Sequence, residues 1–519
     1  MADSHQEHVE TYPAAPGAVA SRAFRVTVDG TPAFVEAYAG VSYVRFAFRG
    51  VVVVEVAFHG EVGAVRLLPR DAATSEAGTS GTLRLTLTEP RPFVAWIGDR
   101  EKLFVLADHP ESPPIADGAA VVALDPPEDR HLATHAIQSA IDQLAARPGG
   151  GTVVLQPGQY VSWTIRLASH VTLYLAAGAL LEGSDDPADY PVDPGRTERG
   201  RDTTLGADAR YDGRTMTFSR LILVDDATDV QIRGRGTISG SGRLLRTHYE
   251  AVPNLVRVRG SRGVAIRDVL LRDAAAWTLH LLASDDVEVS NVKILNDRDN
   301  LNTDGIDPDM STRVRIDRAF VYTKDDAICI KASRNGELEG EVVDVRVTDS
   351  VLSSRDAALK VGTESRAAVF RDITFEHCWV FESGRAMSVV VRDGAAYERI
   401  AFRDIFVDRD VEHLVEQVIG VRDPDARLGS IRDLAFEDIT APDYRVPAGA
   451  WTWYAQFRPG RPTEGRPVPV FSGADDRHQV DGLRLRNVVV NGRPLTSIEE
   501  ADAVAGLTVG PFVRDVEVG

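Results

Sequence analysis

The sequence contains little of what small disulfide-bonded scaffolds, zinc-binding proteins and membrane proteins are built from. Its 519 residues include only two cysteines, Cys329 and Cys378, which cannot form a disulfide framework and lack the spacing of zinc ligands. Both lie in strand-like segments, so we predict two buried free thiols. No run of 18 apolar residues occurs, which excludes a transmembrane helix from the prediction.

Positive charge is also scarce, with 58 Lys and Arg residues against 77 Asp and Glu residues and a net charge of −19. This balance argues against a nucleic-acid partner and against binding to an anionic membrane. The N-terminal segment is polar and has no apolar core of a signal peptide, so we expect a cytoplasmic protein, or a secreted one if a leader was removed. A homo-oligomer is compatible with these features.

Lysine is the rarer basic residue, and a clustered lysine in an arginine-rich chain indicates a need for a compact ammonium group. The chain has five lysines: Lys102, Lys293, Lys324, Lys331 and Lys360.

The pattern of apolar residues predicts an all-β protein with two domains. Residues 1–22 have the composition of a disordered lead-in. Residues 23–125 contain short alternating segments separated by turn residues, which predicts an N-terminal β-sandwich followed by a linker. Residues 126–519 are assigned to a second domain, which opens with an amphipathic helix at 132–147.

The second domain consists of repeats. Similar segments with two short β-branched strands recur at intervals of 23 to 49 residues, which predicts a solenoid whose coils bury one continuous core. A propeller fits poorly because a repeat lacks the four strands of a blade. We therefore predict a parallel β-helix, capped at its N-terminal end by the helix at 132–147. The equivalent apolar positions are Val230, Val264, Val287, Val314, Val345, Ile373, Ile400, Leu434 and Leu483.

Three carboxylates are concentrated within about one coil of this repeat. Asp304 belongs to the sequence Asn302-Thr303-Asp304-Gly305, and Asp325-Asp326 follows 21 residues later. Residues one coil apart lie about 4.8 Å apart, so we expect Asp304 to stack on Asp325 with Asp326 beside them. Carboxyls at this distance raise at least one pKa, and a carboxylic acid beside a carboxylate is what glycoside hydrolysis requires.

Residues 131–519 resemble the polygalacturonase-like enzymes of glycoside hydrolase family 28, in their bacterial branch. The resemblance rests on GGGTVVLQPGQY, VTLYLAAGALLEG, NDRDNLNTDGIDPD, TKDDAICIKA and LKVGTES, which occur in this order. It implies a right-handed parallel β-helix that hydrolyses O-glycosidic bonds of an oligo- or polysaccharide with inversion and without a metal or cofactor. It also implies that Asp325 is the general acid and that Asp304 and Asp326 activate the water.

The chain departs from the family at two elements that contact the sugar. The Gly-His-Gly element is replaced by Asp356-Ala357-Ala358, and the Arg-Ile-Lys element by SVVVRD at 388–393. Because both elements are changed, the resemblance supports membership of the family more strongly than it supports galacturonate, the usual substrate of the family. Asp307 and Asp309 are interpreted as turn residues. The candidates for substrate binding are Asn302, Lys331, Lys360, Glu364, Arg392 and Trp277.

Several alternatives remain open at this point. The related family 49 dextranases pair a β-sandwich with the same β-helix, so a neutral α-glucan is an alternative substrate. A β-helix polysaccharide lyase would use calcium and a basic residue, and a non-catalytic sugar-binding protein would not need all three acids. If the substrate is a short imported oligosaccharide, the segments 185–220 and 444–472 would close the cleft and enforce cleavage from one end.

Overall fold

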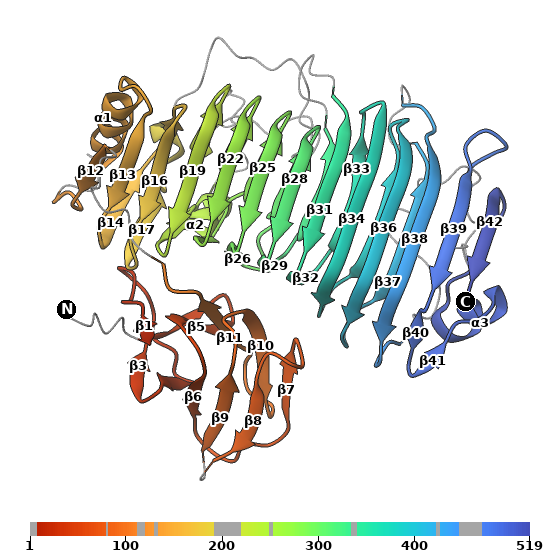
Figure 1. The fold of residues 1–519 in the computed structure, drawn as a ribbon, viewed down its shortest axis with the longest axis horizontal. Helices are drawn as coiled ribbons and strands as arrows, with labels where there is room; N and C mark the ends of the chain where they lie inside the picture. Colours follow the sequence, from red (N-terminus) through yellow and green to blue (C-terminus); the bar gives the residue numbers. More distant parts are fainter. Residues whose placement is uncertain are drawn as a thin grey trace, which may run out of the picture.

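The structure is a computed structural model that describes residues 8–78, 81–111, 120–128, 133–190, 220–248, 253–333, 340–421, 426–445 and 470–519. It contains a small two-sheet domain at the N-terminus and a long parallel β-helix beside it (Figure 1). The all-β fold class and the right-handed parallel β-helix predicted from the sequence are confirmed. The segments 185–220 and 444–472 lie mostly outside the described residues.

The N-terminal domain is a sandwich of two sheets around its own apolar core. One sheet has the order β1-β5-β11-β10-β7 with β4 paired to β5, and the other has the order β3-β2-β6-β9-β8. The first comprises β1 (Val9–Thr11), β4 (Val35–Tyr38), β5 (Val41–Phe48), β7 (Val65–Leu68), β10 (Pro92–Ile97) and β11 (Leu103–Asp108). The second comprises β2 (Arg25–Val28), β3 (Thr31–Ala33), β6 (Val52–Ala57), β8 (Thr74–Ala77) and β9 (Thr82–Leu87).

The predicted disordered lead-in is not observed in the residues described from position 8 onward. β1 pairs in antiparallel fashion with β5, with Val9 opposite Phe48. Tyr12, next to this strand, is buried and its hydroxyl donates a hydrogen bond to Asp108 at 3.2 Å. The polar composition of the N-terminal segment therefore gave no indication of β1, which forms the edge of this sheet.

The β-helix is built from three ladders of parallel strands, one along each face of the solenoid. The first ladder comprises β12 (Val121–Leu124), β13 (Gly151–Leu155), β16 (Val171–Leu175), β19 (Thr228–Gly234), β22 (Arg262–Arg267), β25 (Asp285–Ser290), β28 (Thr312–Asp317), β31 (Val342–Thr348), β34 (Val369–Val380), β36 (Ala396–Val407), β38 (Ser430–Ala441), β39 (Val480–Arg486) and β42 (Val513–Val518). β12 pairs with β13, so this ladder begins a few residues before the boundary expected at 126.

The second and third ladders complete each coil. The second comprises β14 (Gly158–Ser162), β17 (Ala179–Gly183), β20 (Thr237–Ser239), β23 (Leu270–Arg272), β26 (Lys293–Leu295), β29 (Phe320–Thr323) and β32 (Val351–Ser354), then the ends of β34, β36 and β38, and then β40 (Val489–Val490) with β41 (Arg493–Pro494). The third comprises β15 (Ile165–Leu167), β18 (Arg220–Asp225), β21 (Asn254–Arg259), β24 (Leu279–Leu282), β27 (Ile306–Asp309), β30 (Ile328–Ala332), β33 (Ala357–Ser365), β35 (Arg385–Val391) and β37 (His413–Ile419).

The register of the first ladder confirms the predicted repeat. Each apolar position identified from the sequence is the direct partner of the next, from Val230 opposite Val264 to Leu434 opposite Leu483. All of them are buried in one continuous core. Burial of this stacked row of Val, Ile and Leu, at about 25 cal/mol per Å² of apolar surface, is the main term that holds the coils together.

Helices lie at both ends of the solenoid (Figure 1). α1 (Ala133–Ala145) covers the N-terminal end and buries Ile137, Ile141 and Leu144, as the predicted helix requires. α3 (Ile498–Ala505) lies at the C-terminal end, with Ser497 as its N-cap and Gly506 in the left-handed conformation as its C-cap. A short helix, α2 (Gly242–His248), and a 3₁₀ turn, η2 (Pro187–Asp189), occur between strands.

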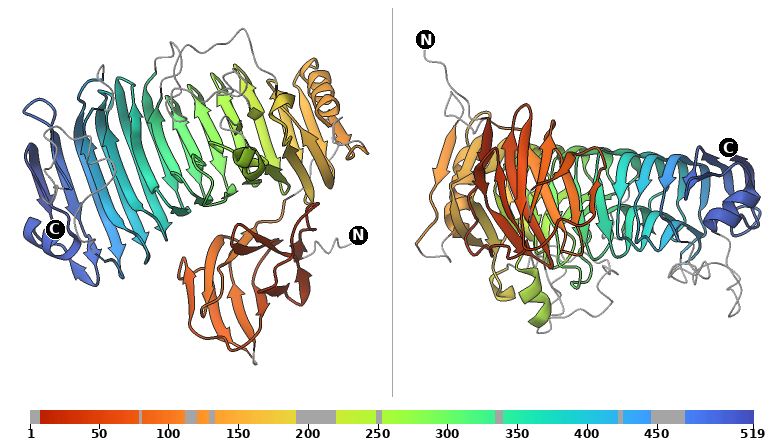
Figure 2. Two further views of the ribbon diagram at one scale, coloured as in Figure 1. Left: turned by 180° about the vertical axis from the view of Figure 1, so that it is seen from behind. Right: turned by 90° about the horizontal axis from the view of Figure 1, so that it is seen from below.

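The N-terminal domain packs against the outer face of the second ladder (Figures 1 and 2). Phe104 is fully buried, with its ring centroid 4.8 Å from that of Phe320 and 5.2 Å from that of Tyr322. Buried ion pairs also join the two parts, including Arg272 with Glu36 at 2.5 Å and Lys293 with Asp108. The domain is therefore held by an apolar patch together with buried charges.

The two cysteines are free and buried, as predicted. No described helix is long and apolar enough to cross a membrane.

Candidate active site

The three predicted acids lie together at the start of adjacent strands of the third ladder. Asp304 precedes β27, and Asp325 and Asp326 precede β30. One carboxylate oxygen of each residue lies within 4.8 Å of those of the other two. Asp304 and Asp326 are buried, whereas Asp325 is partly exposed, so the cluster opens to the outside through Asp325.

The register of the two strands corrects the predicted stack. The Gly305 amide donates to the carbonyl of Asp326 at 2.8 Å, and Ile306 is the partner of Ile328. Asp304 therefore stacks on Asp326, not on Asp325 as expected from the 21-residue interval. A Cβ atom on Gly305 would lie 2.4 Å from the carbonyl oxygen of Ala327, so a glycine is required after Asp304 for the coils to approach.

Two buried lysines neutralise part of this acid cluster. The Nζ atom of Lys331 lies 2.9 Å from Asp304 and 2.8 Å from Asp307, and that of Lys360 lies 2.6 Å from Asp326. Both lysines are 2 % exposed. Buried ions require such pairing, because removing charge from water is costly. These lysines are counter-ions of the acids, and their predicted contact with substrate stays a prediction.

The environment of the cluster shifts its titration. Burial, followed by the charge of Asp326, raises the pKa of Asp325, and Lys360 opposes this change. Burial and three neighbouring carboxylates also raise the pKa of Asp304 despite its contact with Lys331. Burial opposes the charge on Lys331, but Asp304 and Asp307 outweigh it and raise the lysine pKa. The cluster therefore holds acidic protons at pH values where isolated aspartates are ionised.

Asp307 and Asp309 are not turn residues but form part of β27 and are fully buried. Burial raises the pKa of Asp307 to about 7, although Lys331 lowers it. Asp309 binds His280 Nε2 at 2.9 Å and accepts a hydrogen bond from the Ser333 amide at 2.8 Å. Their spacing of two is the period of a strand, which places both on one face and is the sequence signal that could have identified them.

The other predicted residues surround the cluster at different depths. Trp277 is only 3 % exposed, and its ring lies 4.0 Å from Lys331 Nζ and 4.7 Å from the His280 ring. It therefore packs under the acids, and its contact with a sugar stays a prediction. Asn302 and Glu364 are partly exposed, and Asn302 has a left-handed backbone with φ of 55°. Arg392 is buried, with its amide donating to the Ser365 hydroxyl at 2.9 Å.

Arg385 begins β35, one coil beyond β33 and beside the segment Asp356-Ala357-Ala358. Its strand partner is Ala357, the first residue of β33. Its guanidinium also contacts the carboxylate of Asp356, which directly precedes β33. Its Nε atom lies 3.2 Å from Glu416, which also accepts a hydrogen bond from the Ser388 hydroxyl at 3.1 Å. The sequence analysis did not select Arg385 or Glu416, because their partners are 28 or more residues away in the chain.

The three acids are also the kind of oxygen-ligand group that binds a divalent cation. Two of them already contact an ammonium group, Asp304 through Lys331 and Asp326 through Lys360. A cation would have to compete with these lysines, so the donor set fits a hydrolytic acid cluster better than a metal centre.

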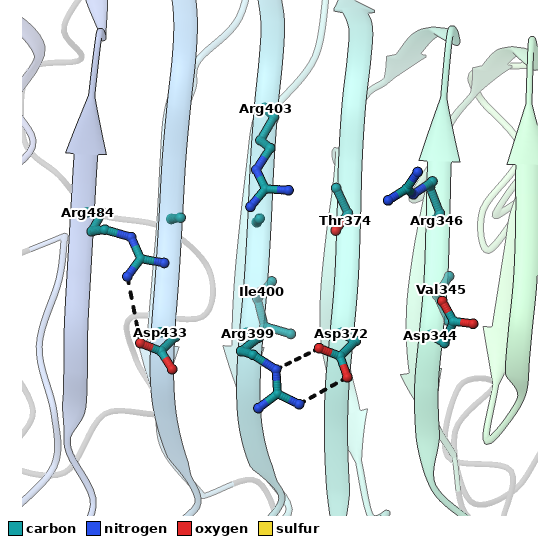
Figure 3. A pocket seen from close by; sticks show the side chains of 12 residues that line it. Asp344, Val345, Arg346, Asp372, Thr374, Arg399, Ile400, Arg403, Asp433 and Arg484 are labelled. Atoms are coloured by element: carbon teal, nitrogen blue, oxygen red, sulfur yellow. Dashed lines mark hydrogen bonds and ion pairs between the residues drawn. The ribbon is translucent and has the colours of Figure 1, made fainter.

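A cavity of about 300 Å³ lies elsewhere, on the outer face of the first ladder (Figure 3). Its floor is formed by small residues of β34, β36 and β38, and its sides carry paired charges such as Arg399 with Asp372 at 2.6 Å. It contains no group of close carboxylates without arginine partners. We therefore place the active site at the acid cluster.

Comparisons with known proteins identify similar sequences and folds. Residues 199–384 match the family described as glycosyl hydrolases family 28, and this segment contains all three acids and both buried lysines. A probable polygalacturonase of Vitis vinifera is 26 % identical over 285 residues, which cover 47 % of this chain and 56 % of the relative. The chain thus spans about half the length of this relative.

Solved structures share the fold. Dex49A from Penicillium minioluteum has a TM-score of 0.65 at 12 % identity, covering 98 % of this chain and 96 % of its own. The polygalacturonase from Erwinia carotovora has a TM-score of 0.52 at 16 % identity, covering 73 % of this chain and 94 % of its own. Over residues 199–384 this chain is similar to the glycosyl hydrolases of family 28, and it shares the β-helix fold of these solved structures.

Proposed function

We propose that the protein is a glycoside hydrolase that cleaves O-glycosidic bonds of an oligo- or polysaccharide with inversion of configuration. The observation that carries this proposal is the unequal pairing of three carboxyls within 4.8 Å of one another. Asp304 and Asp326 each contact an ammonium group, whereas Asp325 forms no salt bridge with any described residue. Asp325 is thus the one acid of the three without a cationic partner, whereas the other two are each held by a lysine.

This difference assigns the roles. Asp325 is the partly exposed acid with a raised pKa, so it protonates the oxygen of the leaving group. Asp304 and Asp326, adjacent in register, hold and deprotonate the attacking water between them. Lys331 and Lys360 contact these two carboxylates and fix their side chains.

The distances between the carboxyl groups do not by themselves determine the stereochemistry of the reaction. Carboxyls in inverting glycosidases are usually about 6.5–9.5 Å apart and those in retaining enzymes about 5 Å apart, so this cluster is compact for inversion. We still infer inversion, because Asp304 and Asp326 act as a pair on one water and neither stands apart as a nucleophile. Nuclear magnetic resonance of the first-formed anomer tests this, and net retention or a trapped glycosyl-aspartate would refute it.

Substitution of the general acid is the direct test of the function. Asp325→Asn should reduce hydrolysis by about 10²–10⁴-fold, because an amide cannot donate this proton. The matched control is Asp286→Asn, an exposed aspartate of β25 with a left-handed backbone that asparagine tolerates. Near-normal turnover of Asp325→Asn, with its fold intact by circular dichroism, would remove Asp325 from the mechanism.

The same assays separate the alternative functions. A polysaccharide lyase would give an ultraviolet-absorbing unsaturated product and lose activity with a chelator. A non-catalytic sugar-binding protein would bind oligosaccharides without releasing reducing ends. Pectin-like and neutral glycans are both candidate substrates for the hydrolase.

A further inference from the structure

Arg385 lies close enough to the acids to contact the same substrate. Asp326 accepts a hydrogen bond from the amide of Ala357 at 3.2 Å, and Ala357 is the partner of Arg385 in the next coil. Two coils of a parallel ladder span about 10 Å, which is the length of one or two sugar units. Beyond Lys360, which contacts Asp326, Arg385 is the next cation along this row of the third ladder among the described residues.

The charge of Arg385 is already neutralised inside the protein. The guanidinium contacts Asp356 and lies 3.2 Å from Glu416, so two carboxylates face one cation. Arg385 is 7 % exposed and Glu416 is 2 % exposed, which keeps these pairs largely out of water. A carboxylate on a bound sugar would therefore contact a guanidinium whose positive charge is already neutralised by two protein carboxylates.

Four other cations around the site are also paired with carboxylates. Lys331 and Lys360 bind the acids themselves. On the rim, Arg298 lies 3.5 Å from Glu382, and Arg355 lies 3.3 Å from Asp299. Lys324, partly exposed directly before Asp325, is the one described lysine without a recorded ion pair.

Negative charge dominates around these residues. Six carboxyls face three cations, namely Asp304, Asp307, Asp325, Asp326, Asp356 and Glu416 against Lys331, Lys360 and Arg385. A further carboxylate buried here would lie beside like charges, which is unfavourable, and among the described lysines only the partly exposed Lys324 could pair with it without breaking an existing ion pair. Sugar hydroxyls, in contrast, can donate hydrogen bonds to carboxylates.

We propose that the sugar unit bound next to the acids is neutral, with hydroxyls and no carboxylate, and that Glu416 and Asp356 enforce this choice by neutralising Arg385. This inference rests on the proposed carbohydrate substrate and specifies its class. It concerns recognition, so it can be tested by binding as well as by hydrolysis.

Oligosaccharides that differ only in the carboxylate test the proposal. Trigalacturonate is compared with its carboxyl-reduced form, an α-1,4-linked galactotriose, and an oligoglucuronate with its carboxyl-reduced glucose form. Binding is measured by titration calorimetry on the Asp325→Asn variant, which should not consume the ligand. We expect the neutral member of at least one pair to bind about tenfold or more tightly than its acidic counterpart. Tighter or equal binding of the uronates, or no binding of any of the four, overturns the inference.

Hydrolysis by the wild-type protein distinguishes this inference from the proposed function. If the neutral sugar binds preferentially but the wild type cleaves neither it nor longer neutral glycans, the specificity holds and the hydrolase proposal fails. If the wild type cleaves galacturonan in preference to the neutral form, the hydrolase proposal holds and the specificity is wrong. Loss of that preference in Lys324→Met would show that Lys324 supplies the cation.

Substitutions at Glu416, Asp356 and Arg385 show whether the neutralisation of Arg385 by these carboxylates causes the preference for a neutral sugar. Glu416→Gln should reduce the preference against uronates about tenfold, and the additional change Arg385→Met should restore the preference. Asp356→Asn, at a more exposed carboxylate, provides the same test if Glu416→Gln does not fold. The matched control is Glu437→Gln, since Glu437 is also a buried partner of an arginine, Arg403 at 2.9 Å, but belongs to the first ladder. An unchanged preference in folded Glu416→Gln and Asp356→Asn variants would refute the role of these carboxylates.

Discussion

The contact of Lys331 with two buried carboxylates makes Lys331→Met the most demanding test of the site. Methionine retains the apolar stem but removes the ammonium group that lies 2.9 Å from Asp304 and 2.8 Å from Asp307. Removing one partner of a buried ion pair costs about 3–5 kcal/mol, because the other charge stays buried and unpaired. With a urea dependence of about 3 kcal/mol/M, the unfolding midpoint should fall by about 1 M or more.

The loss of stability should depend on pH in a defined direction. The pKa of Asp307 is about 7 in the folded protein, against about 3.9 for an unfolded aspartate. A carboxyl with a raised folded pKa contributes stability below its unfolded pKa, and this contribution is lost as the pH rises through about 7. Since Lys331 opposes that rise, its removal moves the folded pKa further upward. The penalty of Lys331→Met should therefore be large at pH 8 and much smaller at pH 5, where Asp307 is protonated in both proteins.

Urea unfolding at pH 5 and pH 8, followed by circular dichroism, measures both effects. The matched control is Lys102→Met, because Lys102 forms its ion pair with Glu382 at 2.8 Å with both side chains about one-fifth exposed. A partly solvated pair of this kind contributes about 0–1 kcal/mol. If Lys331→Met were no more destabilising than the control at pH 8, or equally destabilising at both pH values, the assignment of Lys331 as a buried counter-ion would be wrong.

Two further substitutions test how the site is held in place. Gly305→Ala should lower activity and stability together, because the added Cβ would lie 2.4 Å from the Ala327 carbonyl oxygen and must separate β27 from β30. A variant with full activity would show that this close approach is unnecessary. Phe104→Ala should cost about 3–5 kcal/mol and loosen the N-terminal domain, since Phe104 packs on the Phe320 and Tyr322 rings. Limited proteolysis between the domains measures this release, and unchanged resistance would indicate that the ion pairs alone hold the interface.

The solenoid could be predicted from the sequence because its repeat is a direct consequence of stacking. A coil presents one apolar side chain at the same depth as the coil before it, so the row from Val230 to Leu483 appears in the sequence whatever the intervening turns do. The position of the acids depends on those turns. A difference of one residue in turn length moves the neighbour of Asp304 from Asp325 to Asp326, and composition alone does not specify that length.

Contacts between the two domains could not be predicted for a similar reason. Asp108 is the last residue of β11, the last strand of the sandwich. It accepts a hydrogen bond at 2.8 Å from the side-chain amide of Asn291, which lies 183 residues later in the sequence. Nothing in either local sequence indicates the other. The strand β1 was missed because only three residues pair, and their side chains are mostly polar.

The scarcity of lysine in the sequence corresponds to a distinct structural use of the ammonium group. Lys293, Lys331 and Lys360 are each at most 2 % exposed and paired with aspartates, whereas Lys102 and Lys324 are more accessible. An ammonium group is compact and directs three donors from one atom, so it fits between Asp304 and Asp307 beneath the Trp277 ring. A planar guanidinium would need a wider opening at this depth. The site therefore uses lysine to hold its own acids in place, and Asp325 is the acid left partly exposed beside them.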